Sequence, residues 1–277
     1  MSTSLPNSVD VSVVIPVFNS GVSAIAAVNS VLSQTVKVRQ IVVVDDGSTD
    51  GSGELVFSAF EGIPDVVRVF QIENLGAAGA RNFGILQANS AYIAFLDSDD
   101  LWMPTKLEKQ LGVIDITPSV GMVGTRTTMT PTLVDIGVER LPQKVVVSST
   151  MQLFKNFFQT STVLVRRDVI HKVGAFPAGQ RHAEEGDLFI RIAAHSTSIL
   201  LNEVLVDYGG GKEGFGRTGL SANLNAMEWG ELRNIARAFH RGDCGLLIVV
   251  AATSFSILKF ARRKVVRMLR SARHRLA

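Results

Sequence analysis

Short apolar runs rich in β-branched residues alternate with helix-like segments through the first half of the chain, and this order constrains the fold more than any other feature. Residue ranges expected to be strands are 11–15, 41–44, 66–70, 92–96 and 120–123. Segments with helical character lie between them, at 24–32, 53–60, 78–88 and 104–114. Strand and helix in alternation predict an α/β fold with a mostly parallel, doubly wound sheet covered on both faces.

The second half of the chain is less regular. It contains an expected strand at 163–166, a short helix at 168–173 and a helix at 184–194. Residues 208–219 hold six glycines in twelve positions. We therefore expect a smaller second region that carries a glycine-rich loop.

Length and cysteine content limit how the chain is stabilised. A chain of 277 residues with 46% hydrophobic residues can bury a large core without disulfides or structural metal. Its single cysteine, Cys244, cannot form an internal disulfide, so nothing indicates an oxidising compartment. The first ten residues carry no Lys or Arg, which does not fit a secretion signal. The expected location is cytoplasmic.

Charge is divided unevenly along the chain. Residues 259–277 contain eight basic and no acidic side chains, whereas the first 258 residues contain 20 basic and 25 acidic ones, a net charge of −5. An acidic body argues against nucleic acid as a partner. The basic tail favours an anionic surface.

The tail also has an apolar pattern. Residues 244–258 are uncharged, but these 15 residues are shorter than the roughly 20 needed to span a bilayer as a helix. Beyond them, Ala261, Val265 and Met268 fall on one helical face with most arginines opposite, which is typical of a helix in a membrane interface. We expect peripheral attachment to the inner face of the plasma membrane. The alternative is a core helix at 244–258 followed by a solvated basic helix.

Acidic residues gather where two expected strands end. Asp45 and Asp46 follow the second strand, and Asp97, Asp99 and Asp100 follow the fourth. In open α/β sheets, ligands bind outside the carboxyl ends of the strands. Two carboxylates on one turn can bind a hard cation, which prefers oxygen ligands. Turn geometry and helix capping explain the same residue types without any ligand.

Four sequence blocks together narrow the choice. They read Val-Val-Ile-Pro-Val-Phe-Asn, Val-Val-Asp-Asp-Gly-Ser-Thr-Asp, Asn-Leu-Gly-Ala-Ala-Gly-Ala-Arg-Asn-Phe-Gly-Ile and Phe-Leu-Asp-Ser-Asp-Asp-Leu-Trp. In this order the blocks closely resemble the family 2 glycosyltransferases with the GT-A fold. The resemblance covers residues 9 to 125, and later features extend it to about residue 222.

The resemblance implies how a nucleotide-sugar donor is held. Pro16, Phe18 and Asp45 would bind the nucleotide base, although Phe18 stands where many members have Tyr and so provides stacking without a phenolic hydrogen bond. Arg81 would lie near the donor, and the alternative for it is an ordinary arginine on a helix surface. Asp97 would face the ribose or sugar.

The resemblance also implies a divalent metal and a catalytic base. Asp99 would bind Mn²⁺ or Mg²⁺, which holds the diphosphate. Aligned on Asp187 and Arg191, the family's catalytic Asp corresponds to Glu185, with Glu184 in reserve. Alternatively, the two glutamates stand at the N-terminus of a helix, where the helix dipole favours acidic side chains without any catalytic role. A single displacement with one base inverts the sugar's anomeric centre.

The glycine-rich stretch has several interpretations. Gly-x-Gly-x-x-Gly is found in dinucleotide-binding folds, but the glycines continue through Gly219 and discourage the helix that such a site requires. We favour a lid that carries Lys212 and Arg217 to the diphosphate. A plain flexible connector is the alternative.

These patterns predict a nucleotide-sugar-binding half at 1–127, an acceptor half with the base and lid at 128–240, and the tail at 241–277. The expected enzyme is a metal-dependent, inverting glycosyltransferase that uses a nucleotide-diphosphate sugar, with a UDP-sugar favoured. Its acceptor would be a glycan or a lipid-linked sugar in bacterial surface polysaccharide assembly. The alternatives are an NAD-dependent oxidoreductase and a catalytically silent, membrane-attached sugar-nucleotide-binding module.

Overall fold

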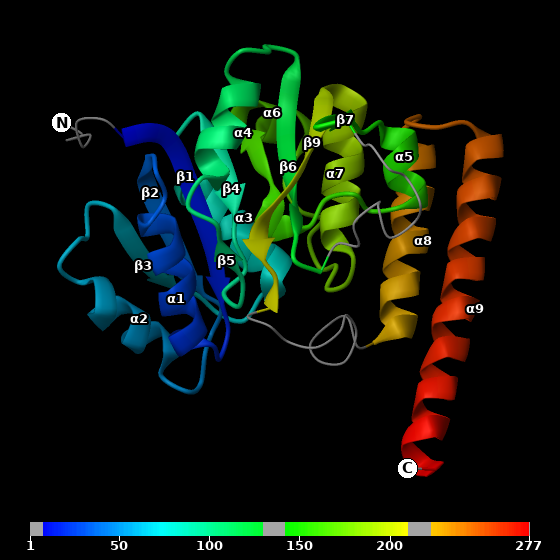
Figure 1. Ribbon diagram of the computed structural model, residues 1–277, viewed down its shortest axis with the longest axis horizontal. Helices are drawn as coiled ribbons and strands as arrows, with labels where there is room; N and C mark the ends of the chain where they lie inside the picture. Colours follow the sequence, from blue (N-terminus) through cyan, green and yellow to red (C-terminus); the bar gives the residue numbers. More distant parts are fainter. Residues whose placement is uncertain (1–7, 130–141, 210–222, 277) are drawn as a thin grey trace.

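A computed structural model describes residues 8–129, 142–209 and 223–276 of the chain, with side chains to residue 268. Within these residues a nine-stranded sheet runs through the body of the molecule, with helices on both of its faces (Figure 1). The strand order is β3-β2-β1-β4-β8-β6-β9-β5, and β7 pairs with β9. The predicted α/β class is confirmed.

The first half forms the parallel part of this sheet. Strands β1, β2, β3 and β4 pair only in parallel with one another, for example Val13 with Ile41. Its elements are β1 (Ser8–Val17), α1 (Gly21–Leu32), β2 (Lys37–Asp45), α2 (Ser52–Phe60), β3 (Val67–Gln71), α3 (Gly76–Gln87) and β4 (Tyr92–Phe95).

The second half adds antiparallel pairs. Strand β8 joins β4 and β6 antiparallel, while β6 and β9 run parallel. The elements are β5 (Leu101–Trp102), α4 (Lys106–Ile114), β6 (Val120–Thr127), β7 (Lys144–Val146), α5 (Ser149–Phe154), the 3₁₀ turn η2 (Thr160–Thr162), β8 (Leu164–Arg166), α6 (Arg167–Val173), α7 (Glu184–His195) and β9 (Thr197–Asp207).

Two hydrophobic cores cover the two faces of the sheet. Along β1, Val13 and Ile15 enter the core with α1, α2 and α4, whereas Val14 enters the core with α3, α6 and α7. Successive strand residues point to opposite faces, so a run without polar interruption requires apolar partners on both. The β-branched runs therefore form buried central strands.

The helix after the fourth strand begins later than the sequence pattern suggests. Helix α4 starts at Lys106 with Thr105 as its N-cap residue. Asp99 and Asp100 therefore do not cap it, and this removes the capping explanation for their place in the sequence.

The C-terminal region is a pair of helices at one edge of the molecule. Helix α8 (Leu224–His240) and the long helix α9 (Leu246–Leu276) lie side by side, and α9 extends past α8 (Figure 1). Ala238 and Ala252 belong to a small core between them, to which α5 and α7 also contribute. The apolar segment and the basic tail thus form one continuous helix. Among the described residues, no helix has the length and apolar character needed to cross a membrane.

Candidate active site

Loops that follow β1, β2 and β4 are joined directly by hydrogen bonds. The Asn19 N–H donates to Ser48 Oγ at 3.0 Å, and the Thr49 N–H donates to Asn19 Oδ1 at 2.9 Å. Ser20 and Ser98 share a hydrogen bond of 2.9 Å between their hydroxyl oxygens. Asn19 has a φ of 48°, a left-handed conformation that Asn tolerates better than most residues. These contacts hold three strand ends together.

The residues expected to hold the nucleotide base lie at the ends of β1 and β2. Pro16 pairs in register with Val44, and Phe18 is exposed just beyond the strand. Asp45 is buried at the end of β2, where its Oδ1 accepts the Ser48 N–H at 3.1 Å. Its Oδ2 is buried and has no hydrogen-bond partner. A buried carboxylate oxygen without a partner is costly, and a bound donor group would offset that cost.

Asp46 ties the second loop to the next helix. Its Oδ1 accepts the Leu75 N–H at 2.7 Å, and Asn74 Nδ2 donates to its carbonyl at 2.9 Å. Burial raises the pKa of Asp46 above its usual range. The second Asp of the pair thus positions the start of α3.

Arg81 is a buried bridge between the two halves of the chain. Its Nη2 donates to Asp97 Oδ1 at 2.6 Å and its Nη1 donates to Glu184 Oε1 at 2.8 Å. Although burial alone lowers the pKa of this guanidinium, the charges of Asp97 and Glu184 raise it above its ordinary value. Arg81 is therefore a permanent cation inside the site, and a surface position on its helix is excluded.

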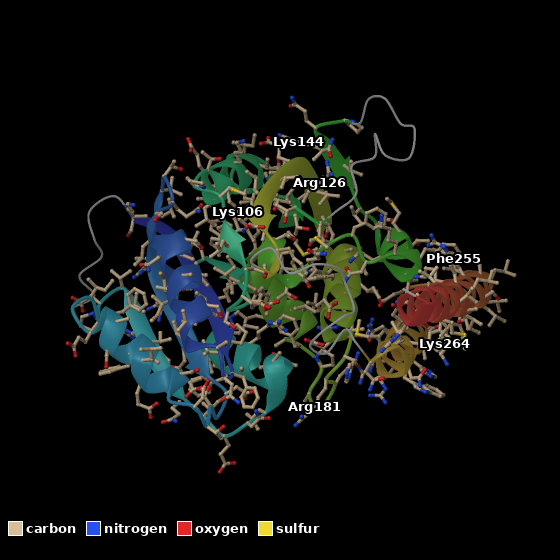
Figure 2. The ribbon with its side chains drawn as sticks, turned by 60° about the horizontal axis from the view of Figure 1, so that its bottom comes forward. Lys106, Arg126, Lys144, Arg181, Phe255 and Lys264 are labelled. Atoms are coloured by element: carbon tan, nitrogen blue, oxygen red, sulfur yellow. The ribbon has the colours of Figure 1, made fainter. Side chains whose placement is uncertain are left out.

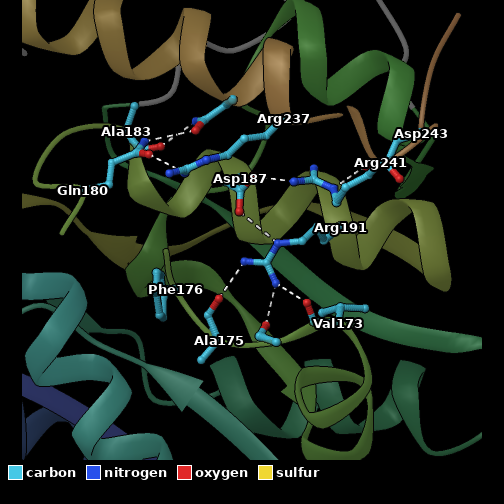
Figure 3. A network of polar contacts seen from close by, with 12 residues as sticks. Val173, Ala175, Phe176, Gln180, Ala183, Asp187, Arg191, Arg237, Arg241 and Asp243 are labelled. Atoms are coloured by element: carbon cyan, nitrogen blue, oxygen red, sulfur yellow. Dashed lines mark hydrogen bonds and ion pairs between the residues drawn. The ribbon is translucent and has the colours of Figure 1, made fainter. Parts of the chain in front are cut away.

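A turn before α7 covers the Arg81 guanidinium. The Phe176 ring centroid lies 5.4 Å from the central carbon of that group. Asn82 holds the turn by accepting the Phe176 N–H and donating to the Phe176 carbonyl, both at 2.9 Å. Arg191 donates to the carbonyls of residues 173, 174 and 175 (Figure 3). The Asp-Leu-x-x-Arg pattern thus supports this turn.

The acidic turn after β4 has an unexpected buried member. Asp97 and Asp99 are partly exposed, whereas Asp100 is buried. Asp100 accepts hydrogen bonds from the Ser161 hydroxyl and from the Gly209 N–H. Burial and the charges of Asp97 and Asp99 raise the pKa of Asp100 to about 7. Asp100 therefore joins the turn to the end of β9.

Two further residues at this site escaped the sequence analysis. Ser161 has no distinguishing pattern around it, and Tyr208 precedes the glycines at the end of β9. Burial and the nearby charge of Asp97 raise the pKa of the Tyr208 phenol. An aromatic residue at a strand end was the one available signal.

Two adjacent glutamates open α7 and differ in their surroundings. Glu184 is buried and paired with Arg81, whereas Glu185 is half-buried and accepts a hydrogen bond from Asn156 Nδ2 at 3.2 Å. Burial, followed by the negative charge of Glu184, raises the pKa of Glu185 to about 7. Ala183 precedes them with a φ of 54°, a strained conformation for this residue type.

The negative charges around the acidic turn suit a divalent cation whose ligands come partly from the protein and partly from a substrate. After burial, the negative charges of four acids raise the pKa of the Tyr208 phenol, namely Asp97, Asp100, Asp99 and Glu185. Arg81 compensates this charge only in part. Among the described residues, no three His, Cys, Asp or Glu side chains are placed to hold a metal. One or two carboxylates combined with phosphate oxygens are a usual arrangement for Mg²⁺.

The expected lid residues fall outside the described residues. Lys212 and Arg217 lie in the segment 210–222. Their proposed contact with the diphosphate stays a prediction.

Sequence comparison places the chain in a family. Residues 12–182, more than half of the chain, match "Glycosyl transferase family 2", and the protein belongs to that family. An uncharacterized glycosyltransferase of Rickettsia conorii is 46% identical over 111 residues, which are 40% of this chain and 18% of that protein. The chain thus matches less than a fifth of that relative's length.

Two other relatives have more specific names. TuaG of Bacillus subtilis, a putative teichuronic acid biosynthesis glycosyltransferase, is 43% identical over 102 residues, 36% of this chain and 40% of TuaG. WfaP of Escherichia coli, a UDP-Glc:alpha-D-GlcNAc-diphosphoundecaprenol beta-1,3-glucosyltransferase, is 40% identical over 104 residues, 36% of this chain and 39% of WfaP. Both of these proteins, which are similar to this chain over little more than a third of its length, are thus named as glycosyl- or glucosyltransferases.

Solved structures share the fold at low sequence identity. The mannosyltransferase PcManGT of Pyrobaculum calidifontis, in complex with GDP-Man and Mn²⁺, superposes with a TM-score of 0.68 at 19% identity over 99% of this chain and 84% of that one. S. aureus TarS 1-349 in complex with UDP-GlcNAc gives 0.64 at 18% identity over 89% and 71%. Both support the GT-A fold.

Proposed function

We propose that this protein is a metal-dependent, inverting glycosyltransferase that moves a sugar from a UDP-sugar to a glycan or lipid-linked acceptor in bacterial surface polysaccharide synthesis. The observation that carries the proposal is the pairing of Arg81 with Asp97 and Glu184. It joins the predicted donor side of the site to the predicted base side through direct contacts of 2.6 and 2.8 Å.

Glu185 is the proposed catalytic base. Arg81 forms an ion pair with Glu184, whereas Glu185 accepts a hydrogen bond from the neutral amide of Asn156 and forms no ion pair within the part of the chain that the structure describes. A base is most effective when its pKa lies near the working pH, and burial raises the pKa of Glu185 to about 7. Glu185 would take the proton of the acceptor hydroxyl as that oxygen bonds to the anomeric carbon and the nucleotide diphosphate leaves. Displacement from the opposite face inverts that carbon.

Asp99 is the proposed ligand for Mn²⁺ or Mg²⁺, with Pro16, Phe18, Asp45 and Asp97 on the donor. When bound, the cation supplies positive charge to the leaving diphosphate. WfaP is named for UDP-Glc, the TarS structure contains UDP-GlcNAc, and the PcManGT structure contains GDP-Man with Mn²⁺. These similar proteins favour UDP and a divalent cation here. Lys212 and Arg217 would add positive charge near the diphosphate.

Substituting Glu185 by Gln tests the base assignment. The amide keeps the size of the side chain but cannot accept the proton, so we expect transfer to fall by about 10²- to 10⁴-fold. Binding of UDP, measured by isothermal titration, should change less than about threefold, because Glu185 does not face the nucleotide in this proposal. Glu203→Gln is a matched control at an exposed glutamate of β9. Undiminished transfer by Glu185→Gln would reassign the role to Glu184 or Asp187.

We also propose that α9 binds an anionic membrane surface. Eight of its residues form an exposed, uncharged outer stripe along one side of the helix: Leu247, Val250, Ala251, Ser254, Leu258, Ala261, Val265 and Met268. Leu247 is 87% exposed and Met268 is 71% exposed. The stripe is about 32 Å long at 1.5 Å per residue, and a continuous exposed apolar surface of this kind marks an interaction site.

The charges of α9 fit this partner. Lys259 and Arg263 turn inward, where they pair with Glu231, and Arg263 also pairs with Glu228. Arg262 and Lys264 stay exposed on the two sides of the stripe, and Figure 2 shows Lys264 on α9 at the edge of the molecule. An apolar stripe bordered by cations matches the boundary between headgroups and acyl chains in an anionic leaflet.

Surface substitutions test the membrane proposal without disturbing the fold. Removing the tail would also remove Arg241, which pairs with the buried Asp187, so substitutions are preferable to truncation. We expect the combined variant Leu247→Gln, Leu258→Gln, Val265→Gln to lose at least about tenfold in affinity for vesicles containing phosphatidylglycerol.

A matched control replaces three exposed apolar residues elsewhere, namely Val22→Gln, Leu86→Gln and Ile116→Gln. This control variant should bind as the unaltered protein does. Co-sedimentation measures both variants. Equal losses in the two variants, or no loss in the α9 variant, would refute the outer stripe as the membrane-binding surface.

A further inference from the structure

A single buried hydroxyl closes the acidic turn after β4. The backbone closes one side of the turn, where the Asp100 N–H donates to the Asp97 carbonyl at 3.1 Å. On the other side, the Asp97 N–H donates to Ser161 Oγ at 3.0 Å, and the Ser161 hydroxyl donates to Asp100 Oδ2. Ser161 therefore contacts the first and last residues of the turn that carries Asp99.

Ser161 is fixed in place by buried neighbours. It is fully buried, and its carbonyl accepts the indole N–H of Trp102 at 2.8 Å. The next carbonyl, that of Thr162, accepts the side-chain amide of Gln110 at 2.8 Å. Lys106, labelled in Figure 2, donates to Gln110 Oε1 at 2.8 Å and lies 3.8 Å from the Trp102 ring centroid. The serine is thus part of a rigid polar network beneath the turn.

We propose that Ser161 is a positioning residue that sets the direction of the Asp97 and Asp99 carboxylates toward donor and cation. The inference rests on the proposed function of these two acids. Without the hydroxyl, the Asp97 N–H and Asp100 Oδ2 would lose their partner in a buried place, and the turn would relax to pair them elsewhere. A shift of the turn displaces Asp99, which the turn carries.

Ser161→Ala tests this role. Changes in groups that orient metal ligands typically cost 10- to 100-fold in metal affinity, so we expect the dissociation constant of UDP measured with Mn²⁺ to rise at least about tenfold. UDP affinity in EDTA should fall less, because the Asp97 carboxylate is also held by Arg81. In transfer assays the donor KM should rise by a similar factor while kcat changes less than about threefold.

Thr162→Val is the matched control. It removes a second buried hydroxyl from η2, the 3₁₀ turn that also carries Ser161. The Thr162 hydroxyl donates to the Gln159 carbonyl and not to Asp97 or Asp100. A purely structural role for Ser161 predicts that both variants lower the melting temperature and neither changes the Mn²⁺ dependence of UDP binding. That result overturns the proposal, whereas a selective loss in Ser161→Ala supports it.

A second variant covers the case in which Ser161→Ala does not fold. Trp102→Phe keeps a buried ring but removes the N–H that holds the Ser161 carbonyl. It should weaken Mn²⁺-dependent UDP binding in the same selective way, and unchanged binding overturns the proposal. Failure of the unaltered protein to bind UDP with Mn²⁺ would instead refute the proposed function.

Discussion

Glu184 and Glu185 are neighbours with the same carboxylate side chain but different surroundings. Glu184 Oε1 lies 2.8 Å from a buried guanidinium nitrogen, whereas Glu185 Oε1 accepts a hydrogen bond from the neutral amide of Asn156. An ion-paired carboxylate is a poor proton acceptor, and a partly desolvated one is a better acceptor. The local contacts therefore favour Glu185 over Glu184 as the base.

The raised pKa of Glu185 predicts how activity depends on pH. A catalytic base works only in its deprotonated form, so kcat/KM should rise about tenfold per pH unit below pH 7 and level off above it. The midpoint should lie well above the usual range for glutamate. Transfer rates measured from pH 5 to pH 9 at saturating Mn²⁺ provide the test. A profile that stays flat down to pH 5 would contradict it.

Glu184→Gln assigns the titrating group. Asp100 also has a pKa raised to about 7, by burial and by the charges of Asp97 and Asp99. Replacing Glu184 removes the negative charge that raises the pKa of Glu185, so the midpoint should move to lower pH if Glu185 is the base. An unmoved midpoint would point to Asp100.

Individual residues show where sequence reasoning succeeds and where it stops. Asp45 and Asp97 stand at strand ends that hydrophobic patterns locate, so their place at one edge of the sheet was predictable. The burial of Arg81 was not, because its partner Glu184 lies 103 residues away in sequence. Ser161 gave no signal, since its proposed role depends on contacts 61 and 64 residues away.

At the scale of elements, α7 connects the proposed base to the rest of the site. Its first turn carries the glutamates, and its second carries Arg191, which holds the turn 173–175 through three carbonyls (Figure 3). Arg191 also pairs with Asp187, which in turn pairs with Arg241 at the end of α8. Asp187 and Arg191 therefore anchor the part of α7 that follows the glutamates to the turn 173–175 and to the end of α8.

Replacing Arg191 with Met should destabilise the protein by about 2–4 kcal/mol, because it breaks a buried ion pair and leaves carbonyls without a donor. Urea unfolding followed by circular dichroism measures this. The control Arg233→Met, at an exposed position on α8, should stay within about 0.5 kcal/mol of the unaltered protein. Similar free energies of unfolding for the two variants would show that the Arg191 network does not stabilise the protein.

Elements of the first half could be predicted and several of the second half could not. Parallel strands buried on both faces have continuous apolar runs that stand out in the sequence. Strand β7 has three residues and α5 has six, too few for a periodic signal. Helix α9 was expected as two segments, because its residues change from uncharged to basic near residue 259. In the structure the helix continues through this point, and Lys259 and Arg263 turn inward to pair with Glu231.

At the scale of the whole molecule, the site and the proposed membrane surface lie on different elements. Loops at the strand ends together with α3 and α7 carry the site residues, whereas the outer stripe belongs to a helix at the edge of the body (Figure 1). The sheet continues through both halves of the chain, so the proposed donor and acceptor sides share one sheet. We therefore expect α9 variants to lose vesicle binding while their transfer to a water-soluble acceptor stays within about threefold.

The central claim is that acids from separate loops bind a nucleotide diphosphate together with a divalent cation. Its most direct test is a thermal-shift panel of UDP-, GDP-, CDP- and dTDP-sugars and NAD, each with Mn²⁺ and with EDTA. The account predicts that a UDP-sugar raises the melting temperature with Mn²⁺, that EDTA removes most of the shift, and that Asp99→Asn abolishes its cation dependence. A shift with NAD alone, or none with any nucleotide sugar, would contradict it.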